Sequence, residues 1–201
     1  MPSEMTFTAE KVTADPSLLT RTLTSPSGVV FTGRLLCSDD AVALGRYFDG
    51  LSEAVTGMYG PHTLNSEHAK ILCREIDYGD SLRFVIEIDG EIHGYFILDL
   101  GLGDKDRARY LKHGCPLNSD ECWTFAPSVS DAYLSHGFGS ALMPLIIDAA
   151  KGFGRRCVVL MGGVREDNPR AQHFYQKFGF ELVGEFYFAN INNLDMVLWL
   201  D

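Results

Sequence analysis

Val129-Ser-Asp-Ala-Tyr-Leu-Ser-His-Gly137-Phe-Gly139-Ser-Ala-Leu142 is the stretch around which the rest of the chain is arranged. It follows a strand-like run at residues 121–129 and opens an apolar helical run, so two glycines stand where a strand becomes a helix. The first turn of a helix carries unpaired backbone N–H groups and the positive end of the helix dipole. Glycines let an anion approach that backbone without meeting a Cβ atom. The stretch therefore predicts a ligand that carries phosphate.

The composition is that of an ordinary globular protein. Of the 201 residues 46% are hydrophobic, enough to bury one sizeable core. Seventeen basic residues against twenty-seven acidic ones give a net charge of −10. Such an average field repels a phosphate backbone, so we expect no nucleic acid among the partners.

The cysteines and the chain ends exclude other classes. The five cysteines are odd in number, scattered and never spaced as Cys-x-x-Cys, which favours reduced, partly buried thiols over a disulfide framework or a zinc site. We expect no bound metal. The N-terminus lacks the basic and apolar regions of a secretion signal, and no apolar run reaches the ~20 residues that cross a bilayer. We therefore expect a soluble, cytoplasmic protein without a membrane partner.

Periodicity divides the chain into an extension and one α/β domain. Residues 1–28 are rich in Thr, Ser and Pro, and we expect a loosely held N-terminal extension before a domain at residues 29–201. Asp89-Gly90 predicts an antiparallel hairpin, and residues 101–118 a solvated excursion with a short helical turn. The strand, helix and strand between residues 121 and 161 predict a right-handed crossover with two parallel strands. Strands are expected at 29–36, 81–88, 91–100, 121–129, 156–161, 180–188 and 194–200, with a turn at 190–193, and helices at 40–51, 66–76, 137–153 and 169–178.

Two motifs carry a family resemblance. Gly137-Phe-Gly139-Ser-Ala-Leu heads one helix, and Asn168-Pro-Arg-Ala171-Gln-His-Phe174-Tyr175-Gln-Lys-Phe178-Gly179-Phe180 forms the next. Together they resemble the GNAT superfamily of acyl-CoA-dependent N-acyltransferases. The likeness follows the element order over residues 29–200 and is motif-specific over 129–180. It implies a mixed, mostly antiparallel sheet of about seven strands with a parallel central pair, flanked by about four helices.

The resemblance implies acetyl-CoA as a cosubstrate, with its pyrophosphate wrapped by the amides of the glycine loop. Leu134 stands where the family usually carries Gln or Arg, which should weaken phosphate binding without abolishing it. His136 either compensates in part or is simply an exposed side chain. A dinucleotide-binding fingerprint is disfavoured, because Leu142 replaces its third glycine. The expected contacts to the cosubstrate are Ser128, Val129, Leu134, Ser135, His136, Gly137, Phe138, Gly139, Ser140, Asn168 and Phe174.

The second motif is a well-delimited helix. Asn168 is a favoured N-cap, Pro169 fits the first helical position and Gly179 can end the helix in the left-handed conformation. Tyr175 lies on its apolar face. It is therefore either a core aromatic or, as the resemblance implies, the acid that protonates the departing thiolate of coenzyme A.

The implied reaction is direct attack of a neutral amine on the thioester, which needs a proton acceptor. Trp123 and Phe125 occupy the strand positions where the family commonly carries a base, and neither accepts a proton. Glu121, further back on the same strand face, is a weak candidate. A water chain, or a group from another element such as His62, Glu75 or Asp99, is equally open.

The thioester carbonyl raises a second question. In the family the N–H two residues before Val129 commonly helps to hold the thioester oxygen, but that residue is Pro127, which has no N–H. Either Ser128 or Val129 donates instead, or the polarisation is weaker.

We therefore expect an acyl-CoA N-acyltransferase, an N-acetyltransferase that acts on a primary amine of a small molecule or peptide. The alternative, motivated by Leu134, Pro127 and the missing strand base, is a catalytically weak or silent acyl-CoA-binding or regulatory domain. The acceptor, the acyl length and the oligomeric state, a homodimer included, stay open.

Overall fold

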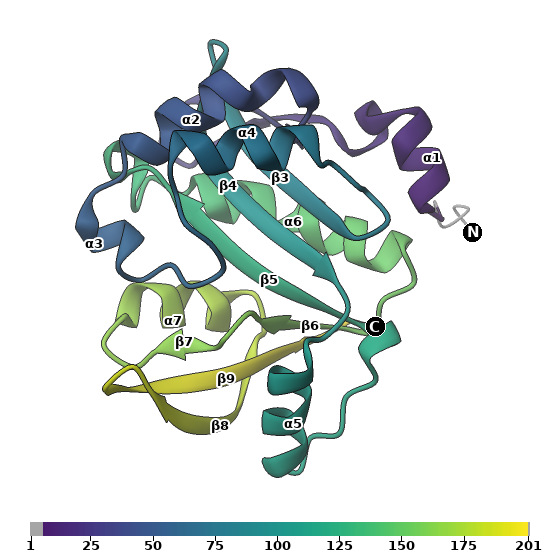
Figure 1. The fold of residues 1–201 in the computed structure, drawn as a ribbon, viewed down its shortest axis with the longest axis vertical. Coiled ribbons are helices and arrows are strands. Elements are labelled where there is room, and N and C mark those ends of the chain that lie inside the picture. Colours follow the sequence, from purple (N-terminus) through teal and green to yellow (C-terminus); the bar gives the residue numbers. More distant parts are fainter. Residues whose placement is uncertain (1–5, 201) are drawn as a thin grey trace.

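A single mixed sheet organises the chain in the computed structural model, which describes residues 6–200 (Figure 1). The strand order is β1-β2-β3-β4-β5-β6-β9-β7, and β8 pairs with the other edge of β9. Among the described residues, β5 and β6 form the only parallel pair. The expected mixed, mostly antiparallel sheet with a parallel central pair is therefore confirmed, but it has nine strands rather than about seven. The strands are β1 (Arg21–Thr24), β2 (Val30–Leu35), β3 (Ser81–Ile88), β4 (Glu91–Leu100), β5 (Cys122–Val129), β6 (Cys157–Leu160), β7 (Val164–Arg165), β8 (Glu181–Phe188) and β9 (Ile191–Trp199).

Helices cover both faces of the sheet. Figure 1 shows α2 and α4 on one face and α6 on the other, with α7 beside the β6–β9 half. The helices are α1 (Ala9–Ala14), α2 (Ala41–Asp49), α3 (Glu53–Thr56), α4 (Ser66–Arg74), α5 (Asp104–Lys112), α6 (Phe138–Gly152) and α7 (Pro169–Lys177), with short 3₁₀ turns η1 (Pro16–Leu19), η2 (Ser38–Asp40), η3 (Ser119–Glu121) and η4 (Asp131–Tyr133).

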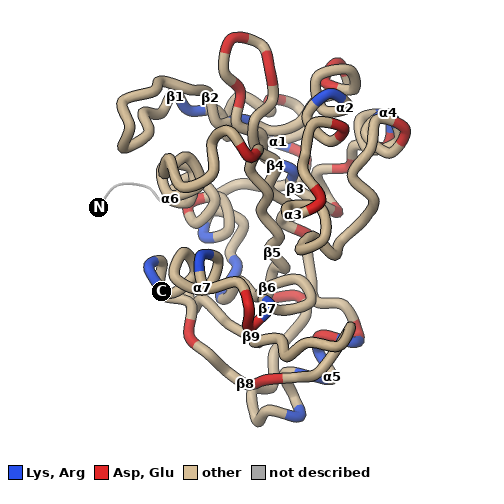
Figure 2. The backbone as a smooth tube through the Cα atoms, turned by 90° about the vertical axis from the view of Figure 1, so that its left-hand side faces the viewer, with Lys and Arg blue, Asp and Glu red and all other residues tan. Residues whose placement is uncertain are grey.

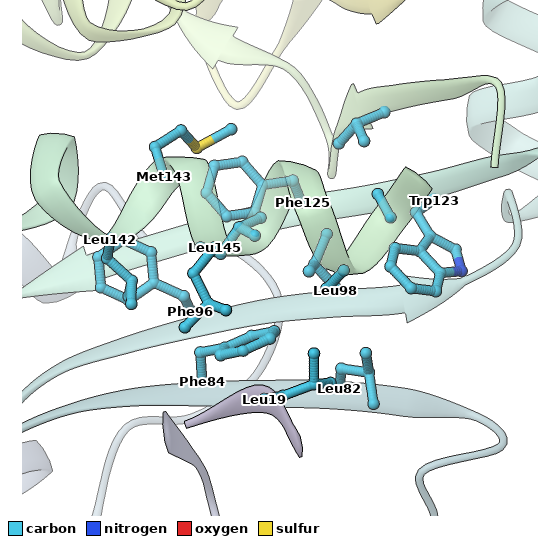
Figure 3. Close-up of a cluster of buried hydrophobic side chains, with 14 of the residues drawn as sticks. Leu19, Leu82, Phe84, Phe96, Leu98, Trp123, Phe125, Leu142, Met143 and Leu145 are labelled. Carbon is cyan, nitrogen blue, oxygen red and sulfur yellow. The ribbon is translucent and has the colours of Figure 1, made fainter. Parts of the chain in front are cut away.

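The largest hydrophobic cluster lies between α6 and the sheet. Figure 3 shows Trp123 and Phe125 of β5 among Leu142, Met143 and Leu145 of α6. Burial of each such side chain contributes roughly 1.5–3 kcal/mol. Because strand residues alternate between faces, this packing turns Trp123 and Phe125 away from the α2 and α4 side of the sheet. A second cluster, on that opposite side, joins Leu44, Phe48 and Leu72 to Val85, Tyr95 and Ile97.

The N-terminal segment is part of this fold, so the expectation of a loosely held extension is wrong for residues 6–28. Val12 and Leu19 are fully buried in the α6-side cluster, and β1 pairs with β2 along its whole length. These elements are a six-residue helix, a 3₁₀ turn and a four-residue strand, each too short to leave a periodic signal in the sequence. Residues 1–5 lie outside the described part.

Two cysteines also depart from expectation. Cys122 and Cys157 form a disulfide, whereas the sequence predicted reduced thiols; Cys37, Cys73 and Cys115 are free. The two bonded residues open β5 and β6 and lie opposite each other in the parallel register. Sequence spacing could not reveal this pairing, because it depends on which strands become neighbours.

Two connections differ in detail. The excursion at 101–118 contains the nine-residue helix α5 rather than a single turn. The last hairpin turns at Ala189 and Asn190, both with positive φ, so residues 191–193 belong to β9 and not to the predicted turn. Asn tolerates that left-handed conformation better than most residues do.

Candidate functional site

A cleft opens where β5 and β6 separate. The two strands pair from Cys122–Cys157 to Phe125–Leu160, and the Met161 N–H still donates to the Phe125 carbonyl at 3.0 Å. Beyond this point residues 126–129 pair only with β4. The cleft here has a volume of about 1400 Å³, above the ~300–1,000 Å³ of a typical small-molecule pocket. It has room for a long ligand that lies along β5.

The backbone of β5 alternates between β4 and the cleft. The Phe125 carbonyl is directed to β6, whereas the N–H of Ser130 donates to the carbonyl of His93 in β4, at 2.9 Å. Backbone N–H and C=O groups point to opposite sides in successive residues of a strand. The backbone groups of Pro127 and Val129 therefore point into the cleft, and those of Ser128 point toward β4. Of the two donors left open by the sequence, Val129 is therefore the one that faces the cleft. Pro127 sits at the unpaired edge, where its missing N–H interrupts no ladder.

The head of α6 closes one end of the cleft. Gly137 is its N-cap with φ +80°, and no side chain caps the helix. A Cβ atom on Gly137 would lie 2.6 Å from the ring of Pro26, so glycine is needed for space as well as for conformation. The N–H groups of this first turn are therefore left without a side-chain cap at the place where the sequence predicts an anion. All of Leu134, Ser135, His136, Gly137, Phe138, Gly139 and Ser140 line the cleft.

Basic side chains gather beside this helix end. The Lys177 ammonium donates to the hydroxyl of Ser140, in the first turn of α6, at 3.2 Å. Arg170 and His173 of α7 also line the cleft, and Figure 2 shows Lys and Arg colouring parts of α7. Lys177 was not among the expected cosubstrate contacts. Its position three residues after the cleft-lining Phe174 nevertheless places both side chains on the same face of the helix.

Helix α7 carries the predicted second motif. The Asn168 side chain accepts a hydrogen bond from the Ala171 N–H at 3.1 Å and so caps the helix. Asn168, Phe174 and Tyr175 line the cleft. Tyr175 is 7% exposed, and within the described residues no group hydrogen-bonds its hydroxyl. Burial raises the pKa of Tyr175, which keeps the phenol protonated at neutral pH.

The far side of the cleft is walled by three segments. They are the loop around α3 with Met58 and Tyr59, helix α5, and the β8–β9 hairpin with Phe186. Arg109 fixes α5 to the sheet, because its guanidinium pairs with the fully buried Asp195 at 2.6 Å and lies over the Phe186 ring. These walls bound the space beside the free edge of β5.

The candidate bases lie in two different places. Glu121 belongs to η3, at the opposite end of β5, where its carboxylate is 45% exposed and 4.0 Å from Arg156. It does not line the cleft, because the chain forms a 3₁₀ turn at residues 119–121 and the strand alternation assumed for Glu121 starts only at Cys122. His62, Glu75 and Asp99 instead come together around a smaller cavity beside the cleft.

Two absences hold for residues 6–200. No group of three or more His, Cys, Asp or Glu side chains there is arranged to hold a metal ion. Among the same residues, none of the helices is both long and apolar enough to span a membrane.

Comparisons with known proteins agree with this geometry. A sequence model described as the acetyltransferase (GNAT) family matches residues 51–180. No curated protein sequence matches the chain.

Solved structures share the fold at low sequence identity. The GNAT domain of S. lividans PAT gives a TM-score of 0.73 at 18% identity, over 92% of this chain and 99% of that one. Mycobacterium smegmatis RimJ in complex with CoA-disulfide gives 0.68 at 18%, over 90% and 86%. The protein yncA from Salmonella typhimurium, solved with acetyl-CoA, gives 0.63 at 18%, over 85% and 94%.

Proposed function

Because this chain belongs to the acetyltransferase (GNAT) family, we propose that it transfers an acetyl group from acetyl-CoA to a primary amine of a small molecule or peptide. One observation carries the proposal: the single parallel strand pair opens into a cleft that runs from the uncapped head of α6 to Tyr175. RimJ and yncA, which share the fold, were solved with CoA-disulfide and acetyl-CoA, and this supports the choice of cosubstrate.

The residues fit the chemistry of coenzyme A. Its diphosphate matches the N–H groups of residues 137–140 and the ammonium of Lys177. Its amide-bearing arm matches the free edge of β5, where Pro127 and Val129 offer carbonyl oxygens to its N–H groups. Leu134 adds no hydrogen bond, so the backbone and Lys177 supply the anion site.

The transfer then needs three groups around the thioester. The amine nitrogen bonds to the acetyl carbon, the C–S bond breaks, and the sulfur leaves as a thiolate. Tyr175, protonated because of its burial, donates its proton to that thiolate, and the proton that the nitrogen loses as the amide forms restores the phenol. The N–H of Val129 is the donor for the carbonyl oxygen in place of the one that Pro127 lacks.

A catalytically silent acyl-CoA-binding domain is the second candidate. It is favoured by Pro127, which leaves the cleft edge of β5 with one donor fewer, and by the apolar Leu134 in the glycine loop. Loss of one oxyanion donor costs about 10²–10³ in turnover, so this candidate differs from a slow enzyme only in degree.

One experiment separates the two candidates. Thiol release from acetyl-CoA is followed with a panel of amines, and coenzyme A binding is measured by calorimetry in parallel. We expect binding and release above the uncatalysed rate with at least one amine. Binding without release on any acceptor would favour the silent domain, and failure to bind coenzyme A would overturn both.

A further inference from the structure

A second cavity, of about 370 Å³, lies on the α2 and α4 side of the sheet and adjoins the main cleft. Pro61 and Met161 line both spaces and mark the place where they meet. Its polar lining includes His62 from the loop after α3, Arg83 from β3 and Asp99 from β4. We call it the side chamber.

His62 is held in one orientation at the edge of this chamber. Its Nδ1 lies 2.9 Å from the Thr63 carbonyl oxygen, which can only accept a hydrogen bond. Nδ1 therefore carries the hydrogen in the neutral ring, and Nε2 carries the lone pair. Nε2 lies 3.3 Å from the Tyr95 hydroxyl, which can donate to it.

Rings on several elements fix the imidazole against the cleft wall. His68 of α4 lies at a centroid distance of 4.5 Å, Tyr59 at 5.4 Å and Tyr95 at 5.7 Å. Tyr59 also lines the main cleft, so one aromatic ring separates His62 from the space beside the thioester. Because each neighbour is itself packed, the position of Nε2 is preorganised.

The surroundings keep this ring neutral. The groups packed around it include Tyr59 from its own loop, His68 from α4, Tyr95 from β4 and Arg83 from β3, and the neighbour on α2, Phe48, is uncharged. Three carboxyl groups line the same chamber: Glu75, Asp80 and Asp99. Burial lowers the pKa of His62, and the positive charges of His68 and Arg83 lower it further, against the opposing effect of the Thr63 hydrogen bond. At neutral pH the ring is an unprotonated imidazole, whose Nε2 lone pair accepts a long, exchangeable hydrogen bond from the Tyr95 hydroxyl.

The other candidates fit the role less well. Trp123 and Phe125 are packed under α6, and Glu121 is at the far end of β5. The Glu75 carboxylate is 62% exposed and pairs with Arg74 at the surface. Asp99 lies in the chamber and burial raises its pKa, but a carboxylate is ordinarily a weaker base than a neutral imidazole.

We propose that His62 is the proton acceptor for the acceptor amine, an inference that rests on the proposed transferase function. An N–H bond of the bound ammonium breaks, its electron pair stays on nitrogen, and the proton passes to Nε2 through a water at the place where the chamber meets the cleft. The neutral amine then attacks the thioester. The imidazolium returns its proton to solvent through the chamber, so the cycle needs no further reactant.

Three variants test the role through activity. His62→Ala is expected to lower kcat about 10²-fold with at least one active amine, while coenzyme A binding is unchanged. His62→Asn keeps a donor for the Thr63 carbonyl but has no counterpart of Nε2, and it should be as slow as His62→Ala. Added imidazole should restore part of the activity of His62→Ala. Full activity of His62→Asn would mean that the Thr63 bond alone matters and would overturn the proposal.

The pH profile adds a matched control. His93, another partly buried histidine whose pKa burial lowers, lines neither cavity. The acid limb of kcat/KM should disappear in His62→Ala and persist in His93→Gln. An acid limb that persists unchanged in His62→Ala would overturn the proposal.

A measurement independent of turnover completes the test. Long-range ¹⁵N spectra of the histidine rings should show His62 neutral at pH 7 with the hydrogen on Nδ1; a hydrogen on Nε2 would exclude it as the base. Lack of turnover by the wild-type protein would count against the proposed function, whereas wild-type rates retained by His62→Ala would count only against His62.

Discussion

Asp131, in the turn after β5, accepts two hydrogen bonds from Ser52, one from its hydroxyl at 2.6 Å and one from its backbone N–H at 3.0 Å. At the other end of the same loop, the side-chain amide of Asn168 donates to the sulfur of Met58 at 3.3 Å. The loop around α3 therefore touches the segments that carry both sequence motifs. It also lines the cleft, with Met58 and Tyr59.

Asp131→Ala should loosen this loop. We expect KM for the acceptor to rise about two- to tenfold because both Ser52 hydrogen bonds are lost, while the unfolding free energy changes by less than ~0.5 kcal/mol because the pair is exposed. The Ser52 hydrogen bonds hold the pKa of Asp131 below its usual range. The contribution of these hydrogen bonds is therefore fully present above the pKa of Asp131 in the unfolded chain. It is lost as the pH falls through the lower pKa of Asp131 in the folded protein.

Ser52→Ala removes the shorter of the two bonds and serves as the partner in a double-mutant cycle. Each rise in KM is converted to a free energy, and the value for the double variant should be smaller than the sum of the values for the two single variants. Strict additivity would show that the two residues act independently.

Tyr175→Phe should lower kcat about 10²-fold, because the thiolate then leaves without a proton donor. Affinity for coenzyme A should stay within about twofold, since the ring keeps its packing against Phe125 and Phe180. Steady-state thiol release and calorimetry measure the two quantities. An unchanged kcat would make the phenol a core residue only.

The glycines of the loop should differ in their response to alanine. Gly137→Ala combines a positive φ with a Cβ atom 2.6 Å from Pro26, and we expect a loss of about 2–4 kcal/mol in unfolding free energy. Gly154→Ala, with φ +71° and open space, isolates the backbone effect and should cost about 1 kcal/mol. Equal losses would show that Pro26 moves aside freely.

Gly139→Ala should affect binding rather than folding. Gly139 has no positive φ, and an added Cβ would make an ordinary 3.4 Å contact with Phe174, at the cleft. We expect an unfolding free energy within ~1 kcal/mol of wild type and an affinity for coenzyme A about tenfold lower. Urea unfolding measures the stability, and calorimetry measures the affinity. A large loss of stability with an unchanged affinity would contradict this prediction.

The sequence alone predicted the elements whose signals are local. Strands 81–88 and 91–100 match β3 and β4 at both ends, because an Asp-Gly turn separates two uninterrupted apolar runs. The parallel pair followed from the strand–helix–strand order, and the N-cap Asn168 marked the start of α7.

Features that depend on tertiary neighbours were not predicted. The disulfide needs β5 beside β6, and the side chamber needs α4 packed over β3 and β4, which brings His62 near Arg83. Helix α5 was missed because only Tyr110 of its nine residues is buried, so it carries almost no apolar stripe. Glu121 was misplaced because a period of two was extended into a 3₁₀ turn.

Lys177→Ala should weaken coenzyme A binding about three- to tenfold, because the ammonium lies beside the first turn of α6. The dependence of the affinity on salt should become shallower at the same time, since one opposite charge is lost. Lys151→Ala, at the other end of α6, is the matched control and should leave both quantities unchanged. Equal effects of the two variants would show that only net charge matters.

The buried ion pair of Arg34 and Asp40 should give the fold a defined acid sensitivity. Burial opposes ionisation of Asp40, but the Arg34 hydrogen bond and the Cys37 N–H outweigh it and hold its pKa below the usual value. The pair therefore adds stability above the unfolded pKa of ~3.9, and this stability is lost as pH falls through the folded pKa.

Arg34→Leu should leave the Asp40 carboxylate, 9% exposed, without its cation. We expect the unfolding free energy to fall by about 2–4 kcal/mol at pH 7. The difference from wild type should become smaller below pH ~4, because protonated Asp40 carries no charge for Arg34 to balance. The control is Arg46→Leu, whose pair with Glu91 is half exposed and should contribute less than ~1 kcal/mol. Urea unfolding of both variants at pH 7 and pH 3 measures the difference, and a loss at Arg34 that is independent of pH would assign its effect to packing of the side chain rather than to charge.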